Sequence, residues 1–189
     1  RTMIQQVAQQ LGSDLLSQVA FVGGCTTGLH ITDEFTKEKV RYTEDVDLII
    51  HVLGYTGWNK FREQVMARGF KISMDDEVIC RFRLGSLCVD FMPDDESILK
   101  FSNRWYSDAL ATAQPYQMDN DIIIRLVTPS YFLATKFEAF KGRGNSDLLA
   151  SRDMEDIMNL VDGREELLTE VHNNPAQLKV YLAAAFTQL

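Results

Sequence analysis

The chain has 189 residues, of which 46% are hydrophobic and 24% charged, and with 11 Gly and 4 Pro it is neither disordered nor fibrous. Nineteen basic against 27 acidic side chains give a formal net charge of −8, which disfavours a large non-specific nucleic-acid surface. No apolar run approaches the roughly 18 residues of a membrane span, and the polar start of the chain is not signal-like. We therefore expect a cytoplasmic protein with no membrane partner.

The cysteines and histidines fit no metal or redox pattern. Cys25, Cys80 and Cys88 cannot all pair, and their spacing matches neither a zinc ribbon nor a Cys-x-x-Cys motif. The three histidines stand singly along the chain. We therefore expect reduced thiols with a packing role.

Up to residue 127, segments whose apolar residues have helical spacing are separated by short runs that are apolar throughout or apolar at every second residue. This part is therefore predicted to contain both helices and strands. Gly12 marks the end of the first helix, and Gly85-Ser86 fits a two-residue hairpin turn. In chain order, we expect a helix over residues 3–11, a strand over 19–22, a helix beginning near residue 25, a solvated loop over 33–44, a strand over 46–52, a helix over 55–69, strands over 78–84 and 87–92, a partly helical stretch over 98–110 and a strand over 122–127.

After Pro129 the chain loses its β-rich runs and shows helical spacing alone. The change places a boundary at about Val127, between an α/β domain over residues 1–127 and a helical domain over 128–189 that packs on it. The predicted fold class is α+β: a mixed β-sheet flanked by helices and followed by a C-terminal helical bundle, with a ligand cleft expected at the junction. The four helices are expected near residues 130–141, 151–162, 163–173 and 175–187.

Three aspartates are the main candidates for chemistry. Asp45 and Asp47 stand two apart at the head of a strand, so both carboxylates project from one face and can share a divalent cation. Alone, this pair is as consistent with surface charge as with a metal site. Asp90 lies inside an otherwise apolar strand, where an unpaired charge would be costly. If strands 46–52 and 86–92 are neighbours, the three carboxylates converge, and Mg²⁺ relieves their repulsion most simply.

Gly23 and Gly24 follow the first strand and precede a helix. Without Cβ atoms, their backbone lets a phosphate approach closely, and the N–H groups of the following helix can hold it. Such a pair on its own indicates no more than a sharp turn. Beside three carboxylates it favours a phosphate cradle, and the combination indicates metal-assisted phosphoryl or nucleotidyl transfer.

The helical half supplies two further candidates. Lys136 lies one helical turn from Phe132 among apolar neighbours, where a lysine head group needs an anion or water within reach. A nucleotide phosphate fits this need, and a snorkelling surface lysine is the alternative. Asp153 fits an active-site role as well as favourable charge at a helix N-terminus, whereas Arg152 and Asp156 have the spacing of an ordinary helical ion pair.

Four short motifs follow one another along the chain. They are Gly23-Gly24-Cys25-Thr26, Arg41-Tyr42-Thr43-Glu44-Asp45-Val46-Asp47, Leu133-Ala134-Thr135-Lys136 and Ser151-Arg152-Asp153-Met154-Glu155-Asp156-Ile157. The first two resemble the signature of DNA polymerase β-like nucleotidyltransferases. The last two resemble the AbiEii-type branch, the nucleotidyltransferase toxins of type IV toxin–antitoxin and abortive-infection systems. The resemblance covers the chain from Phe21 to Leu160.

This resemblance implies a nucleotidyltransferase-type sheet with an Mg²⁺-dependent site. Asp45, Asp47 and Asp90 would bind Mg²⁺, and Asp90 would also be able to act as base on the acceptor hydroxyl. Asp153 would complete the helical part of the site. Two features depart from the family pattern: Cys25 stands where a Ser or Thr is usual, and twenty residues separate Gly24 from Asp45. The residues that would contact the nucleotide are Gly23, Gly24, Thr26, Thr43 and Lys136, with Lys136 at the triphosphate.

Together these features predict an enzyme that moves an NMP from an NTP to a hydroxyl acceptor, which is an RNA such as a tRNA, a protein or a small molecule. The AbiEii-type form of this activity would be a toxin, with a cognate antitoxin as a further partner. The alternative, motivated by Cys25 and the long loop, is an inactive module of the same fold that binds a nucleotide or a partner. A small-molecule transferase of the antibiotic-modifying kind would be marked by extra acids in a pocket between the two halves.

Overall fold

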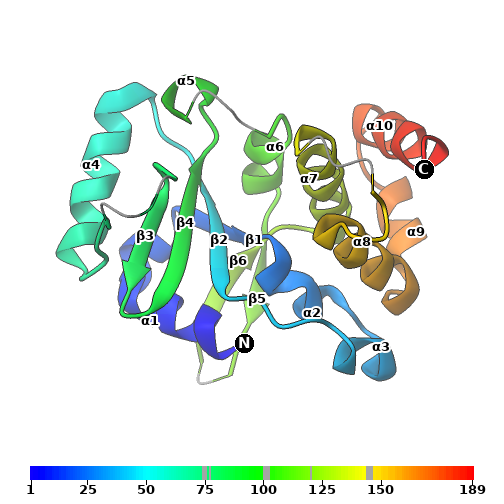
Figure 1. Cartoon of the computed structure of the whole chain (residues 1–189), viewed down its shortest axis with the longest axis horizontal. Coiled ribbons are helices and arrows are strands. Elements are labelled where there is room, and N and C mark those ends of the chain that lie inside the picture. The colour runs from blue at the N-terminus through cyan, green and yellow to red at the C-terminus, as the bar shows by residue number, and fades with distance from the viewer. Residues whose placement is uncertain (74–75, 77, 100–102, 120, 144–146) are drawn as a thin grey trace.

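The computed structural model describes residues 1–73, 76, 78–99, 103–119, 121–143 and 147–189. Its strands are β1 Val19–Val22, β2 Asp45–Ile50, β3 Arg81–Leu84, β4 Leu87–Pro93, β5 Gln114–Gln117 and β6 Ile123–Leu126. Within these ranges they form a six-stranded sheet in the order β3-β4-β2-β1-β6-β5 (Figure 1). The sheet is mixed, because β2 is parallel to β4 and β1 to β6, whereas β1 and β2 are antiparallel.

Helices cover both faces of this sheet, so the α+β fold class is confirmed. The helices α1 and α4 pack on one face, and α7, α8 and α10 lie toward the other (Figure 1). The helical elements are α1 Thr2–Leu16, the 3₁₀ turn η1 Gly24–Thr26, α2 Thr27–His30, α3 Glu34–Glu38, α4 Gly54–Ala67, α5 Glu96–Leu99, α6 Tyr106–Ala111, α7 Pro129–Gly142, α8 Arg152–Gly163, α9 Leu167–His172 and α10 Ala176–Thr187.

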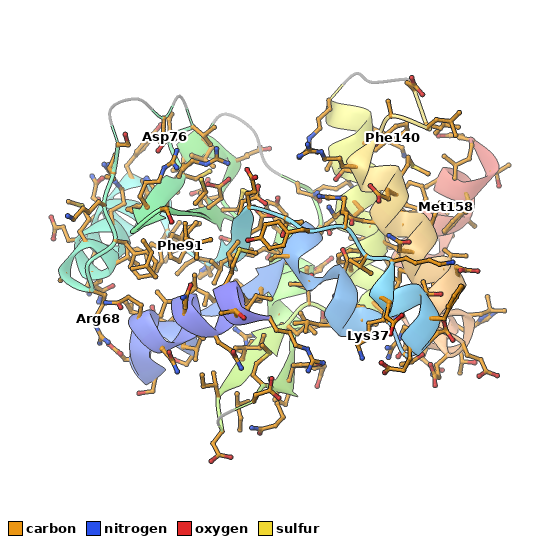
Figure 2. All side chains as sticks on the ribbon, turned by 60° about the horizontal axis from the view of Figure 1, so that its bottom comes forward. Lys37, Arg68, Asp76, Phe91, Phe140 and Met158 are labelled. Atoms are coloured by element: carbon orange, nitrogen blue, oxygen red, sulfur yellow. The ribbon has the colours of Figure 1, made fainter. Side chains whose placement is uncertain are left out.

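The core between the sheet and α4 is rich in aromatic side chains. Phe91 of β4 lies at its centre (Figure 2), where its ring meets those of Phe61, Phe70 and Phe82 edge to face at centroid distances of 5.1, 5.6 and 5.4 Å. Edge-to-face pairs of this kind are favourable beyond the area they bury. The sheet is therefore held firmly on this side, away from its charged face.

Alternation along β2 decides where the aspartates point. Leu48 faces the aromatic core, and Ile49 faces the second core, which the sheet shares with α7 and α8. Asp45 and Asp47 have the same parity as Ile49, so they project from the face that is turned toward the helical half. Asp90 is the register partner of Asp47 and projects from the same face.

Most of the predicted elements are confirmed, including the four C-terminal helices and the hairpin turn between β3 and β4. The predicted boundary at Val127 falls in the connection between β6 and α7, and the division into two domains stays a prediction. Of the stretch predicted to be partly helical, residues 100–102 lie outside the described residues, and α5 and α6 flank them. None of the described helices has the length and apolar character needed to cross a membrane.

The sequence analysis fails at two places, the loop expected over 33–44 and the strand β5. The stretch predicted as a loop over 33–44 contains α3, where Asp33 caps the helix by accepting a hydrogen bond from the N–H of Thr36 at 2.7 Å. The predicted end of the first helix at Gly12 is confirmed, because its φ of +70° and ψ of 166° are not helical, and a second helical segment follows within α1 up to Leu16. The sequence pattern does not predict β5, because its residues lack apolar alternation, and this strand pairs with β6 at the sheet edge. The cysteines are free thiols, as expected.

Candidate active site

Three carboxylates meet where the pairing of β2 with β4 brings them side by side. In this parallel register Asp47 is the partner of Asp90, and Asp45 is the partner of Cys88. One oxygen of each of the three aspartates lies within 4.8 Å of the other two. Asp90 is buried, whereas Asp45 and Asp47 are half-buried and so remain open on one side. This set of oxygen donors fits a hard divalent cation such as Mg²⁺.

The glycine turn lies directly against this acidic trio of Asp45, Asp47 and Asp90. Val22 at the end of β1 is opposite Asp47, so Gly23 follows beside the carboxylate. Gly23 has a φ of +76°, which favours glycine, and a Cβ at this position would collide with the side chain of Asp47. Both the backbone conformation and the close approach of Asp47 therefore require glycine here.

The surroundings of Asp47 make the ionisation of its carboxyl group costly. Burial, followed by the negative charges of Asp45 and Asp90, raises its pKa to about 7. The positive charges of Lys136 and Arg143, which come from α7 and its C-terminal end, oppose this rise. The neighbouring cations therefore do not fully neutralise the three carboxylates. This remaining negative charge is the electrostatic reason to expect a divalent cation.

Asp90 already has a cationic partner within the protein. Arg81 pairs with it across the β3–β4 hairpin and donates from Nε to Oδ1 at 2.8 Å and from Nη2 to Oδ2 at 2.7 Å. Bidentate pairs of this kind are strong and fix the geometry of the carboxylate. The Arg81 guanidinium is therefore the cationic partner that an aspartate in an apolar strand needs, and the binding of Mg²⁺ by Asp90 stays a prediction.

The helices α7 and α8 carry a buried ion cluster formed by Lys136, Asp153 and Asp156. The Nζ atom of Lys136 lies 3.1 Å from Oδ1 of Asp153 and 2.6 Å from Oδ2 of Asp156. Arg143 binds the other oxygen of Asp153 at 2.7 Å, and Arg41 binds Asp156 at 3.1 Å. Burial disfavours the charged lysine, but the charges of the two aspartates outweigh it and raise the pKa of Lys136. Lys136 is therefore not a snorkelling surface lysine.

The helical ion pair predicted for Arg152 and Asp156 is wrong. Asp156 points inward, where Thr27 Oγ1 donates a hydrogen bond to it at 3.0 Å in addition to the contact with Lys136. Arg152 is exposed at the start of α8. The signal for this arrangement was available, because residues three apart share one face of a helix and Asp156 stands three residues after Asp153.

No family model matches the chain, and no curated protein matches it significantly in sequence. An antigenic nucleotidyltransferase-like protein from Paracoccidioides brasiliensis is similar in structure, with a TM-score of 0.58 and 22% identity over 99% of this chain and 87% of that one. ANT(2″)-Ia in complex with adenylyl-2″-tobramycin has a TM-score of 0.52 and 13% identity over 100% and 99%. A solution structure of ANT(2″)-Ia has a TM-score of 0.50 and 10% identity over 97% and 93%. The chain has a nucleotidyltransferase fold.

Within this nucleotidyltransferase fold, the other predicted nucleotide contacts lie around the glycine turn. The hydroxyl of Thr26 is buried and donates to the carbonyl of Gly23 at 2.8 Å, so it is committed to the turn. Thr43 is buried, and its Cγ2 would lie 3.1 Å from a Cβ placed at Gly24. The thiol of Cys25 donates to a backbone carbonyl at 3.3 Å, and burial raises its pKa. Thr43 and the two glycines therefore lie together beside the acidic trio.

Arg41 and Arg81 contact the site residues, and the sequence analysis assigned neither of them a role. The signal for Arg81 was available, because a hairpin turning at Gly85-Ser86 places residue 81 opposite residue 90. The signal for Arg41 was weaker: the residue belongs to the second motif, but its contact with Asp156 joins segments 115 positions apart in the chain. Such a contact depends on packing rather than on local pattern.

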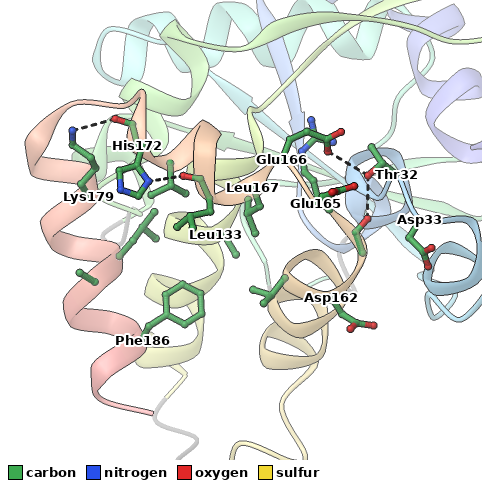
Figure 3. Close-up of a pocket in the computed structure, with 17 residues that line it drawn as sticks. Thr32, Asp33, Leu133, Asp162, Glu165, Glu166, Leu167, His172, Lys179 and Phe186 are labelled. Carbon is green, nitrogen blue, oxygen red and sulfur yellow. Dashed lines mark hydrogen bonds between the residues drawn. The ribbon is translucent and has the colours of Figure 1, made fainter.

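One cavity of the protein is lined by a member of the acidic trio, and a larger one is not. A cavity of about 320 Å³ is lined by Asp45 together with Arg41, Arg81 and Arg152. A larger one of about 1030 Å³ lies among α8, α9 and α10, and Thr32 and Asp33 complete its wall (Figure 3). The acids that line this larger cavity, Asp33, Asp162, Glu165 and Glu166, are not members of the trio. Extra acids in a pocket between the two halves would mark a small-molecule transferase, and these four acids lie in a cavity whose wall comes mainly from the helical half, with Thr32 and Asp33 from the other half.

The raised pKa of Asp47 predicts that Mg²⁺ stabilises the protein in a pH-dependent way. Asp47 ionises at a lower pH in the unfolded chain, so its contribution to stability is full below about pH 4 and is lost as the pH rises through about 7. Mg²⁺ binds the ionised form and restores this loss. Millimolar Mg²⁺ should therefore raise the unfolding temperature more at about pH 8 than at about pH 5.5.

Calorimetric scans of two variants provide the control for this effect. Asp47→Asn should remove the difference between the two pH values, whereas Asp119→Asn, at an exposed acid on the β5–β6 connection, should keep it. Equal Mg²⁺ shifts at both pH values in the wild type would contradict the assignment.

The buried cluster predicts that Lys136→Met lowers the free energy of unfolding by about 3 kcal/mol, because two buried carboxylates lose the cation they share. Urea unfolding in EDTA measures this change without any contribution from metal binding. Lys60→Met, at an exposed position of α4, should change stability by less than about 0.5 kcal/mol. A cost below about 1 kcal/mol for Lys136→Met would refute a structural role for the cluster.

Proposed function

We propose that this chain is an Mg²⁺-dependent nucleotidyltransferase: a hydroxyl group of an acceptor attacks the α-phosphorus of an NTP, the NMP is transferred to that oxygen, and pyrophosphate leaves. The observation that carries the proposal is the meeting of Asp45, Asp47 and Asp90 from two neighbouring strands, directly beside Gly23. The nucleotidyltransferase fold supports it, because one structural neighbour is ANT(2″)-Ia in complex with adenylyl-2″-tobramycin.

Each member of the site has a role in this proposal. Asp45, Asp47 and Asp90 would hold Mg²⁺, which supplies charge neutralisation for the phosphates and lowers the pKa of the attacking hydroxyl. Asp90, whose orientation is fixed by Arg81, would accept the proton of that hydroxyl. The protein otherwise positions the reactants, which is the main requirement of phosphoryl-type transfer.

The helical half contributes to the same site. The charge of Lys136 opposes the rise in the pKa of Asp47, and in this proposal its ammonium group would serve the triphosphate of the NTP. Asp153 binds Lys136 and Arg143, and it positions both cations. Gly23, Gly24 and Thr43 form the surface beside Asp47 on which the phosphates would lie. The hydroxyl of Thr26 supports the turn itself.

The acceptor in this proposal is an RNA such as a tRNA, a protein or a small molecule. The motifs that resemble the AbiEii-type branch support a toxin of a toxin–antitoxin system, with a cognate antitoxin as partner. The structural likeness to ANT(2″)-Ia supports a small molecule. The acceptor hydroxyl must in every case reach the open side of Asp45 and Asp47.

A second candidate function is an inactive module of the same fold that binds a nucleotide or a partner. Two observations favour it: Cys25 replaces the usual hydroxyl residue, and both oxygens of Asp90 are engaged by Arg81. Calorimetric titration with each NTP in the presence of Mg²⁺, followed by a transfer assay, separates the two candidates. Binding without transfer to any acceptor supports the inactive module.

The proposed activity predicts that Asp47→Asn lowers nucleotide transfer at least about a hundredfold, because the site loses a metal ligand and a negative charge. The assay incubates the protein with Mg²⁺, labelled NTPs and fractions of cellular RNA, protein and small molecules, and then counts label in each fraction. Asp119→Asn is the matched control and should transfer at the wild-type rate. Wild-type transfer by a folded Asp47→Asn variant would contradict the proposed function.

A further inference from the structure

The cavity of about 1030 Å³ among α8, α9 and α10 has largely apolar walls. Its apolar lining comes from four helices and includes Leu133, Val161, Leu167, Leu168, Leu182 and Phe186. Leu168 and Val161 expose 70% and 43% of their surface, so apolar area remains uncovered at this cavity. A concave space of this size, with apolar walls and a few polar groups, has the usual form of a small-molecule site.

Four carboxylates line one end of this cavity (Figure 3). They are Asp33, Asp162, Glu165 and Glu166. In the part of the chain that the structure describes, none of the four forms an ion pair. The hydrogen bonds that three of them accept come from uncharged donors, the N–H and hydroxyl of Thr36 and the hydroxyl of Thr32. The negative charge at this end is therefore not compensated by a neighbouring cation.

The basic residues of the lining do not neutralise these acids. Arg164 donates from Nε and Nη2 to Glu170, at 2.7 and 2.6 Å, and from Nη1 to the carbonyl of His30 at 2.7 Å. Its charge is thus paired with an acid that does not line the cavity. Lys179 and His172 lie at the opposite end, where Nζ of Lys179 donates to the carbonyl of His172 at 3.2 Å (Figure 3). The acidic end of the cavity therefore attracts cations.

This cavity is separate from the acidic trio. None of Asp45, Asp47 and Asp90 is among its lining residues. Along α8, Asp162 at the cavity lies about 13 Å from Asp153 of the buried ion cluster, because each helical residue adds about 1.5 Å. A molecule in this cavity would therefore bind to a surface that has no role in the proposed transfer reaction.

We infer that this cavity binds an organic cation with an apolar body, such as an amine that carries aromatic rings, at a second site outside the active site. The ammonium group of this ligand lies at the acidic end, and its apolar part contacts Leu168 and the neighbouring walls. Glu165 and Glu166 are exposed, so their attraction for the cation is worth about fivefold in affinity, and burial of the apolar part supplies the rest. The inference does not rest on the proposed function.

Three molecules that share one apolar body and differ in charge test this inference: diphenylpropylamine, diphenylpropanol and diphenylpropanoate. Isothermal titration of each into the full chain, in EDTA and without nucleotide, measures binding apart from metal and catalysis. The amine should bind about fivefold more tightly than the alcohol, and the carboxylate more weakly than the alcohol. No measurable binding of the amine, or equal affinities of the amine and the carboxylate, would overturn the inference.

Two double variants assign this charge preference to the acidic end. Glu165→Gln with Glu166→Gln should lower the affinity for the amine at least about threefold and leave the affinity for the alcohol unchanged. Glu63→Gln with Asp121→Asn is the matched control, because it removes two exposed carboxylates outside the cavity. All four side chains are exposed and belong to no described ion pair, so both variants should unfold at the wild-type temperature. An unchanged preference in the first variant, or a lost one in the control, would refute the assignment.

The apolar wall and the position of the ligand have their own tests. Leu168→Ser should weaken the amine and the alcohol by the same factor, about threefold, whereas Leu149→Ser, at a fully exposed leucine outside the cavity, should weaken neither. Asp47→Asn should bind the amine as the wild type does, and a loss of binding in this variant would place the ligand at the trio and overturn the second site. Because every titration measures binding alone, a chain that prefers the amine but transfers no nucleotide would refute the proposed function and leave this inference standing.

Discussion

Repulsion among three carboxylates is the constraint to which the rest of this structure responds. Strand pairing brings Asp47 beside Asp90, and the alternation of β2 adds Asp45 on the same face. Lys136 reduces the repulsion from the helical side, and Arg81 neutralises Asp90 from the neighbouring strand. The compensation is incomplete, because the pKa of Asp47 still rises to about 7. Adjacent ionised carboxylates raise the free energy of the folded protein, and a bound cation lowers it again.

The same charges connect the helical half to the sheet. Lys136 is bound by Asp153 and Asp156, and Arg41, from the segment that leads into β2, is bound by Asp156 as well. The lysine therefore has two tasks, since it stabilises the contact between the halves and acts on Asp47. In the proposed function, a phosphate that attracts Lys136 has to compete with two buried carboxylates, so nucleotide binding would be coupled to the packing of α7 on α8.

The sequence was sufficient to predict those features of the site that depend on the pattern of residues within one strand. Alternation gave the shared face of Asp45 and Asp47, and the apolar surroundings of Asp90 marked it as a residue in need of a partner. The identity of that partner as Arg81 follows from hairpin register, which the turn prediction already contained. The inward position of Asp156 and the formation of β5 depend on packing between distant segments, and no local pattern encodes such packing.

One fold can carry many chemistries, so the residues of the site decide the function. The claim on which this account depends is that the acidic trio binds a divalent cation. Anomalous diffraction from crystals of the protein grown with Mn²⁺ tests it directly. The account predicts an anomalous peak in contact with oxygens of Asp45, Asp47 and Asp90, and this peak should be absent in Asp47→Asn. Mn²⁺ bound only elsewhere, with no peak at the trio, would contradict the account.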